Sequence, residues 1–130
     1  MRVSEMVQSG DWKGEKHVPV IEAPKSVKAG EAFEVSVSVG KEIAHPNTTE
    51  HHIRWIRLYF KPKSGKFAYD VGYFEFNAHG EAAGGPNTGS VYTEPSGAVC
   101  IKITEPGEFV AVSFCNIHGL WESSASIDVQ

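Results

Sequence analysis

Alternation of apolar and polar residues is the feature that most limits what this chain can fold into. In the segment FEVSVSV at residues 33–39, every second side chain is apolar, and the same period recurs at 99–104 and at 125–129. A period of two is typical of a β-strand with one face buried, because successive side chains of a strand point to opposite sides. The chain is therefore expected to be built mainly from strands.

Three further segments support this expectation. Residues 52–61 and 67–76 are rich in aromatic and β-branched side chains, and residues 109–115 follow a Glu-Pro-Gly-Glu turn. A turn is predicted at 62–65 and a long glycine-rich loop at 80–93. About seven strands, with almost no helical periodicity, indicate an all-β fold. The prediction is an immunoglobulin-like, seven-stranded antiparallel β-sandwich.

The length and charge of the chain limit its organisation and partners. Its 130 residues suit one domain spanning 1–130, with residues 1–14 as an N-terminal arm. Within the arm, residues 3–9 are expected to form a short helical turn capped by Ser4. The formal net charge of -4, without any run of Lys or Arg, argues against binding to nucleic acid or anionic lipid.

Neither a secretory signal nor a membrane helix is predicted. The first ten residues, MRVSEMVQSG, contain no apolar core of a signal peptide. No apolar run approaches the roughly 18 residues that a spanning helix needs. We therefore expect a soluble, cytoplasmic protein.

The two cysteines, Cys100 and Cys115, are expected to differ in role. In a cytosolic chain, metal binding or a free thiol is a better expectation than a disulfide. Cys100 has no histidine near it in sequence, so we expect a free thiol that is buried or partly buried. Cys115 begins the motif Cys115-x-x-His118, whose two-residue spacing lets a tight turn direct both side chains at one ion.

Metal-ligand residue types gather in three segments of the sequence. Glu15-Lys16-His17 and Cys115-Asn116-Ile117-His118 flank a third segment, His45-Pro46-Asn47-Thr48-Thr49-Glu50-His51-His52. Thiolate and imidazole donors suit iron, copper or zinc rather than magnesium or calcium. A structural zinc site closes at four ligands. Five candidates, with a carboxylate as a sixth, suit the larger coordination number of iron; they are His17, His45, His51, Cys115, His118 and Glu15.

Four segments resemble the superoxide reductase family in its one-iron, neelaredoxin-type form. They are EKHVPVIE at 15–22, HPNTTEHHIRW at 45–55, YTEP at 92–95 and CNIHGLWE at 115–122. The resemblance implies an immunoglobulin-like fold and a ferrous iron held by four coplanar imidazoles and an axial thiolate. It assigns Cys115 as the axial ligand and Glu15 as the ligand of the sixth position in the oxidised state. It places Lys16 beside the open position. The equatorial ligands would be His17, His45, His51 and His118.

The resemblance also implies an activity and partners. A chain of this family reduces superoxide to hydrogen peroxide, receives electrons from a rubredoxin-type donor, and is often a homotetramer. Two-iron relatives carry a further four-cysteine centre. This chain lacks those cysteines, so a second iron is not expected.

The sequence also bears on three residues near the candidate ligands and on two rival functions. His52 should face away from His51 and either support the metal ligands from behind or serve in packing. His79 should have no metal role, and Trp121 should cover the metal. A blue-copper carrier would use two histidines, one cysteine and a weak axial methionine, but both methionines here are N-terminal. A binding module with a structural zinc would be colourless and redox-inactive.

Overall fold

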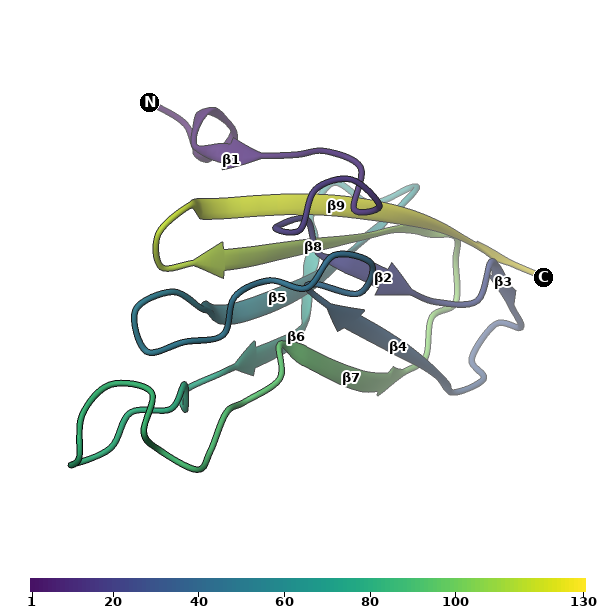
Figure 1. Cartoon of the computed structure of the whole chain (residues 1–130). Helices are drawn as coiled ribbons and strands as arrows, with labels where there is room; N and C mark the ends of the chain where they lie inside the picture. The colour runs from purple at the N-terminus through teal and green to yellow at the C-terminus, as the bar shows by residue number, and fades with distance from the viewer.

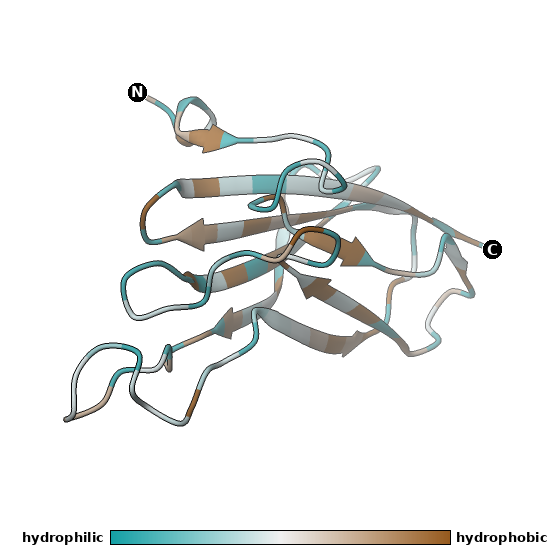
Figure 2. Ribbon diagram, in the orientation of Figure 1, coloured by the Kyte–Doolittle hydropathy of each residue, from teal (hydrophilic) through white to brown (hydrophobic).

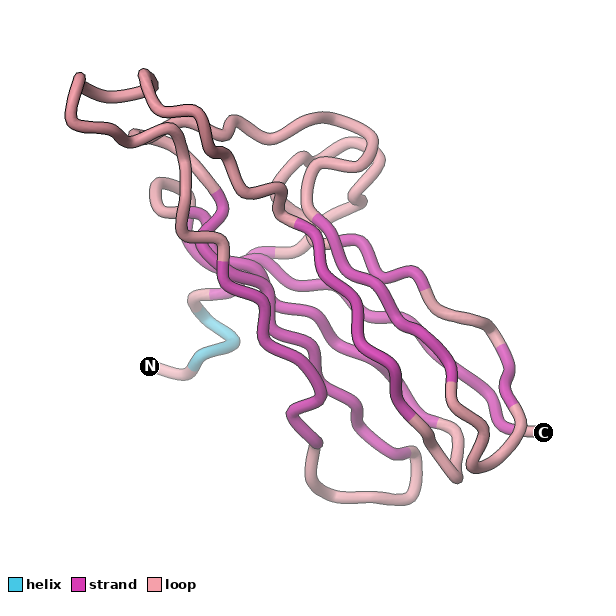
Figure 3. The backbone as a smooth tube through the Cα atoms, turned by 90° about the horizontal axis from the view of Figure 1, so that it is seen from below, coloured by secondary structure: helices cyan, strands magenta, loops and turns pink.

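The segments with period two form the strands of two β-sheets packed face to face (Figures 1 and 3). The computed structural model describes all 130 residues. The larger sheet has the order β1-β9-β8-β5-β6, with β3 paired to β9, and the smaller has the order β2-β4-β7. The strands are β1 (Val7–Gln8), β2 (Val20–Glu22), β3 (Ser26–Val27), β4 (Phe33–Ser38), β5 (Ile53–Pro62), β6 (Tyr69–Glu75), β7 (Ser96–Ile101), β8 (Gly107–Cys115) and β9 (Gly119–Val129).

The core lies between the sheets and is built from the apolar half of each alternating strand (Figure 2). Val35 and Val37 of β4 face Ile56 and Leu58 of β5, and all four are at most 1% exposed. Phe109 of β8 is fully buried among them. Burying each such side chain contributes about 1.5 to 3 kcal/mol, which stabilises the pairing of the two layers.

The predicted all-β, immunoglobulin-like sandwich is confirmed. Seven strands have three or more residues, and the pairings among them are antiparallel. The short strands β1, β2 and β3 were not predicted individually. The two-residue strands β1 and β3 both pair in parallel with β9. No helix in the structure has the length and apolar character needed to cross a bilayer.

Two local predictions were wrong. The N-terminal turn is only a three-residue 3-10 helix, Val3–Glu5, and the residue that caps it is Arg2 rather than Ser4. Residues 7–8 pair with β9 instead of continuing the turn, because backbone bonds to a strand edge replace the unmade helical ones. Cys100 is exposed rather than buried, since it lies on the outward face of β7, opposite Glu34.

One end of the sandwich collects the segments that carry the candidate ligands. β5 begins where β8 ends, because Ile53 pairs with Cys115. Strands β8 and β9 are joined by three residues, Asn116 to His118, and Cys115 pairs with Gly119 across this hairpin. Gly119 has a φ of +79°, which favours glycine and closes the turn. The loop before β5 and the hairpin therefore meet at this end (Figure 1).

Candidate metal centre

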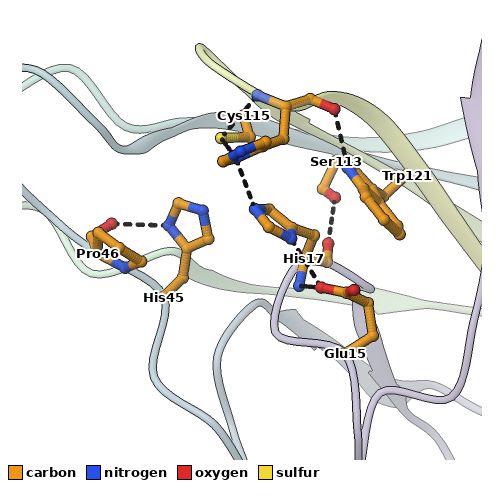
Figure 4. Close-up of polar contacts among 8 residues, drawn as sticks. Glu15, His17, His45, Pro46, Ser113, Cys115 and Trp121 are labelled. Carbon is orange, nitrogen blue, oxygen red and sulfur yellow. Dashed lines mark hydrogen bonds and ion pairs between the residues drawn. The ribbon is translucent and has the colours of Figure 1, made fainter.

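Four potential metal-binding side chains from three distant segments converge at this end of the sandwich. Figure 4 shows three of them, His17, His45 and Cys115. One donor atom from each of them lies within 4.8 Å of all the others; the four are His17, His45, His51 and Cys115. His118 completes the group from the hairpin: its Nδ1 is 3.1 Å from His17 Nε2 and 3.8 Å from Cys115 Sγ. The structure thus brings together all five residues that the sequence singled out as histidine and cysteine ligands.

The four imidazoles form a closed ring around a common centre. The imidazole centroids of His17 and His45 are 4.8 Å apart, and those of His45 and His51 are 4.7 Å apart. The centroids of His51 and His118 are 5.0 Å apart, and those of His118 and His17 are 4.7 Å apart, so the four imidazoles surround one point. The diagonal from His17 to His51 is longer, at 6.4 Å. Such an arrangement can direct four nitrogens toward one ion.

Hydrogen bonds to the outer nitrogens of His17 and His45 turn the Nε2 atoms of these rings toward the other potential ligands. Nδ1 of His45 donates to the Pro46 carbonyl at 2.7 Å, and Nδ1 of His17 donates to Glu15 Oε1 at 2.7 Å. Nε2 of His45 and of His51 are buried without any partner. Unpaired buried nitrogens are costly, so their lone pairs call for a cation between them. The residues present therefore fit a bound metal ion.

Burial favours the neutral form of two of the clustered histidines, His45 and His51, and a metal ion binds only neutral imidazole. Burial lowers the pKa of His45 to about 4, against the Pro46 carbonyl, which raises it. Burial is also the main cause that lowers the pKa of His51, and the charges of His118, His17 and Lys16 act in the same direction. At neutral pH both rings offer a lone pair rather than a second proton.

Glu15 lies outside the cluster of donor atoms. Its carboxylate accepts hydrogen bonds from both Nδ1 and the backbone N–H of His17. The bond from the ring is the main reason that the pKa of Glu15 lies below its usual value. A carboxylate on the outer nitrogen of a ligand histidine sets its tautomer and orients the ring. Lys16 is half-buried, and its charge acts on His45 and His51.

His52 is a packing residue, as its position beside His51 predicted. Its ring stacks on His79 with centroids 3.6 Å apart and planes inclined by 5°. Nδ1 of His52 donates to the Thr48 carbonyl, and both nitrogens of His79 face oxygens, Asn47 Oδ1 and the Phe76 carbonyl. This pair joins the loop that carries His45 and His51 to the segment after β6.

We expect that His79→Ala lowers the free energy of unfolding of the metal-free protein by about 2 to 4 kcal/mol. The change removes the ring that contacts the buried Phe76 carbonyl and Asn47 Oδ1, and it opens a cavity beside His52. Urea unfolding followed by far-UV circular dichroism measures the loss. Asn77→Ala is the matched control, since this exposed side chain bonds only to Glu75. Equal stability of the two variants would refute the bracing role of His79.

Sequence reasoning missed the contribution of Asn116. Its side-chain oxygen accepts the N–H of His52, its amide donates to the Glu50 carbonyl, and its backbone N–H donates to the His52 carbonyl. Asn116 thus ties the hairpin to the histidine loop. Its place between Cys115 and His118 was the only signal available in the sequence.

A β-sandwich that gathers four imidazoles and one thiol at its end defines a class of protein, the mononuclear iron proteins with histidine and thiolate donors. The sequence model of the family described as desulfoferrodoxin matches residues 9–124. The chain belongs to this family.

Individual relatives are similar over nearly their whole length. Neelaredoxin of Megalodesulfovibrio gigas is 62% identical over 127 residues, which cover 98% of each chain. Superoxide reductase of Pyrococcus furiosus is 56% identical over 126 residues, covering 97% of this chain and 99% of the relative. The structure of superoxide reductase (neelaredoxin) from Archaeoglobus fulgidus in the reduced form superposes with a TM-score of 0.89 at 53% identity, covering 95% of this chain and 99% of that one.

Proposed function

We infer that this chain is a superoxide reductase: it combines superoxide with one electron and two protons to give hydrogen peroxide. The observation that carries this function is the closed ring of four imidazoles beside a buried thiol, with unpartnered nitrogens facing inward. Relatives that match 97% of this chain bear the name superoxide reductase.

The ligands that we propose for the iron are four imidazoles and one thiolate. They are His17, His45, His51, His118 and Cys115. A ferrous ion bound there supplies the electron and, with one thiolate, gives the centre a formal charge of about +1. Cys115 is 1% exposed, so its thiolate is shielded from water. The backbone N–H of His118 donates to Cys115 Sγ at 3.3 Å, which stabilises the anionic sulfur.

Lys16 is proposed to attract superoxide to the open position and to organise the water that delivers protons. A unit charge at about 4 Å attracts an anion by roughly 4 kcal/mol at an effective dielectric constant near 20. Surface charges farther than about 10 Å are largely screened at ordinary salt concentration. A single lysine near the site can therefore outweigh the formal net charge of -4.

We expect that Glu15→Ala leaves the rate of superoxide reduction by the ferrous protein nearly unchanged. The Glu15 carboxylate would hold the iron only in its oxidised state, so the reacting ferrous form would not use this side chain. The variant also loses the hydrogen bond to His17 Nδ1, and the iron dissociation constant should rise about tenfold. Pulse radiolysis measures the rate. A large loss of rate at full iron loading would contradict the proposal.

We further propose that the chain is one iron-binding domain, 1–130, with residues 1–14 as an arm, working in the cytoplasm with a rubredoxin-type electron donor. The parallel pairing of Val7–Gln8 with β9 supports an arm that is part of the domain. Reduction of the oxidised protein by rubredoxin, followed by stopped-flow absorbance, tests the donor. The absence of electron transfer would exclude it.

A homotetramer is the proposed assembly. The outer face of the larger sheet carries partly buried apolar side chains that do not pack on the core, among them Val112, Phe114 and Trp55. Trp55 stacks on Phe114, at 5.6 Å between centroids, so apolar rings occupy part of this outer face. Sedimentation should give four chains of 14.2 kDa each. Val112→Asp should dissociate them, and a monomeric wild type would refute the assembly.

Metal analysis, the visible spectrum and the reaction with superoxide together test the function. We expect one iron per chain, a blue colour from thiolate-to-ferric charge transfer in the oxidised protein, and bleaching on reduction. The blue-copper alternative predicts that the protein contains copper and no iron. The structural-zinc alternative predicts a colourless protein that superoxide does not oxidise. Either result would refute the proposed function.

A further inference from the structure

His17 is held in place without belonging to any strand. It lies in the turn before β2, yet it is only 6% exposed. The strand ladders that position Cys115 do not extend to it, and only Glu15 bonds its backbone N–H. Other side chains must therefore fix its orientation, since an unrestrained loop would sample many conformations.

Two serine hydroxyls from the inward face of the larger sheet bind the backbone of this turn. Ser113 Oγ donates to the His17 carbonyl at 3.1 Å, and Ser123 Oγ donates to the Pro19 carbonyl at 2.6 Å. Ser113 is fully buried on the inward face of β8, where the other buried residues are Phe109, Ala111 and Cys115. A buried hydroxyl in a core is costly unless it is bonded, so its one partner defines its task.

Trp121 contacts two of the proposed metal ligands, His17 and His118. It is the direct partner of Ser113 across the β8–β9 pair. Its ring lies against the ring of His17, with centroids 5.0 Å apart and planes inclined by 16°. Its indole N–H donates to the His118 carbonyl at 3.1 Å (Figure 4). One side chain thus restrains a ligand from the loop and a ligand from the hairpin.

We propose that Ser113 and Trp121 are the positioning residues of the iron centre: this cross-strand pair holds His17 in its metal-binding orientation before the ion arrives. The proposal rests on the proposed ligand roles of His17 and His118. Ser113 fixes the backbone of His17, Trp121 covers one face of its ring, and Glu15 holds Nδ1. These contacts restrain the backbone of His17, one face of its ring and its Nδ1, and they leave Nε2 directed at His118.

Preorganisation of this kind raises metal affinity because the protein does not have to order the ligand when the ion binds. Partners that orient a ligand typically account for about 10- to 100-fold of the affinity. The pair restrains a loop ligand that the ladder cannot reach, so losing it should weaken binding of the ion more than it changes the fold. That distinction separates positioning from simple packing.

The test is anaerobic titration of Fe²⁺ into the metal-free protein against a chelator of known affinity. We expect that Ser113→Ala raises the iron dissociation constant about tenfold, and that Trp121→Leu raises it by 10- to 100-fold. Trp121→Phe should restore part of the affinity, because it keeps a ring on His17 but loses the bond to His118. Imidazole ¹⁵N spectra of the metal-free variants should show His17 in more than one environment.

The controls are Ser124→Ala and Trp55→Phe. Ser124 lies next to Ser123 on the opposite face of β9, and Trp55 lies on the outer face of β5. Both should keep wild-type affinity. Unchanged affinity in Trp121→Leu, or an equal loss in the controls, would overturn the positioning roles. A wild type that binds Fe²⁺ tightly but does not reduce superoxide would overturn the proposed function alone.

Discussion

Replacing Cys115 by serine is expected to abolish the blue colour of the oxidised protein and to lower its iron affinity by more than about 100-fold. Serine cannot supply a soft thiolate, because its hydroxyl stays protonated at neutral pH and its oxygen is a hard donor. Without the sulfur, the charge-transfer absorption from thiolate to ferric iron is lost. The rate of superoxide reduction should fall with it, since electron donation by the thiolate favours release of the electron.

The visible spectrum and the iron content per chain measure this effect. Cys100→Ser is the matched control, because Cys100 is exposed on the edge strand β7 and does not belong to the group of potential metal-binding side chains. It should leave the colour and the iron content unchanged. A blue, fully loaded Cys115→Ser protein would show that the sulfur is not a ligand.

Removing the charge of Lys16 is expected to slow the second-order reaction with superoxide about tenfold while the iron stays bound. Electrostatic attraction of a charged substrate changes association rates by about 10- to 1,000-fold, and one lysine supplies the lower part of this range. Pulse radiolysis of Lys16→Ala gives the rate, and metal analysis shows that the site is loaded. The rate of the wild type should also fall as salt is added.

Lys63→Ala provides the comparison for Lys16. Lys63 follows Pro62, which pairs with Gly107 at the end of β5 opposite Ile53 and Cys115. The distance between the two ends exceeds the screening length of about 10 Å at ordinary salt concentration, so this variant should react at the wild-type rate. Equal rates for Lys16→Ala and the wild type would remove the attracting role from Lys16.

The parts of the fold that could be predicted are those where local pattern and tertiary packing agree. Strand β4 buries one face, so its apolar residues recur with the period of a strand. Strands β5 and β8 carry apolar residues on both faces, and their richness in aromatic and β-branched side chains indicated them. The two-residue strands β1 and β3 bury no such face, and only their pairing with β9 defines them. The position of Cys100 was mispredicted for a related reason: burial of an edge-strand face depends on what covers it.

The candidate site divides in the same way. Three short segments hold the imidazole and thiol side chains, and their chemistry alone indicated a metal. The carboxylate of Glu15 was expected at the sixth position of the oxidised centre, which stays a prediction. The structure adds its bond to His17 Nδ1. Trp121 was expected to cover the metal, and the structure adds its stacking on His17 and its bond to the His118 carbonyl. Such contacts depend on the register of β8 against β9, which no local pattern encodes.

The amino-acid sequence by itself determined that this chain forms a β-sandwich and that it carries donors suited to iron, because strand periodicity and ligand chemistry are properties of residues and their spacing. Only the tertiary structure decided which side chains hold those donors in place. Ser113 and Asn116 look like ordinary strand and turn residues until β5, β8 and β9 align. Hydrogen bonds between residues far apart in sequence exist only after long-range packing has set their distance.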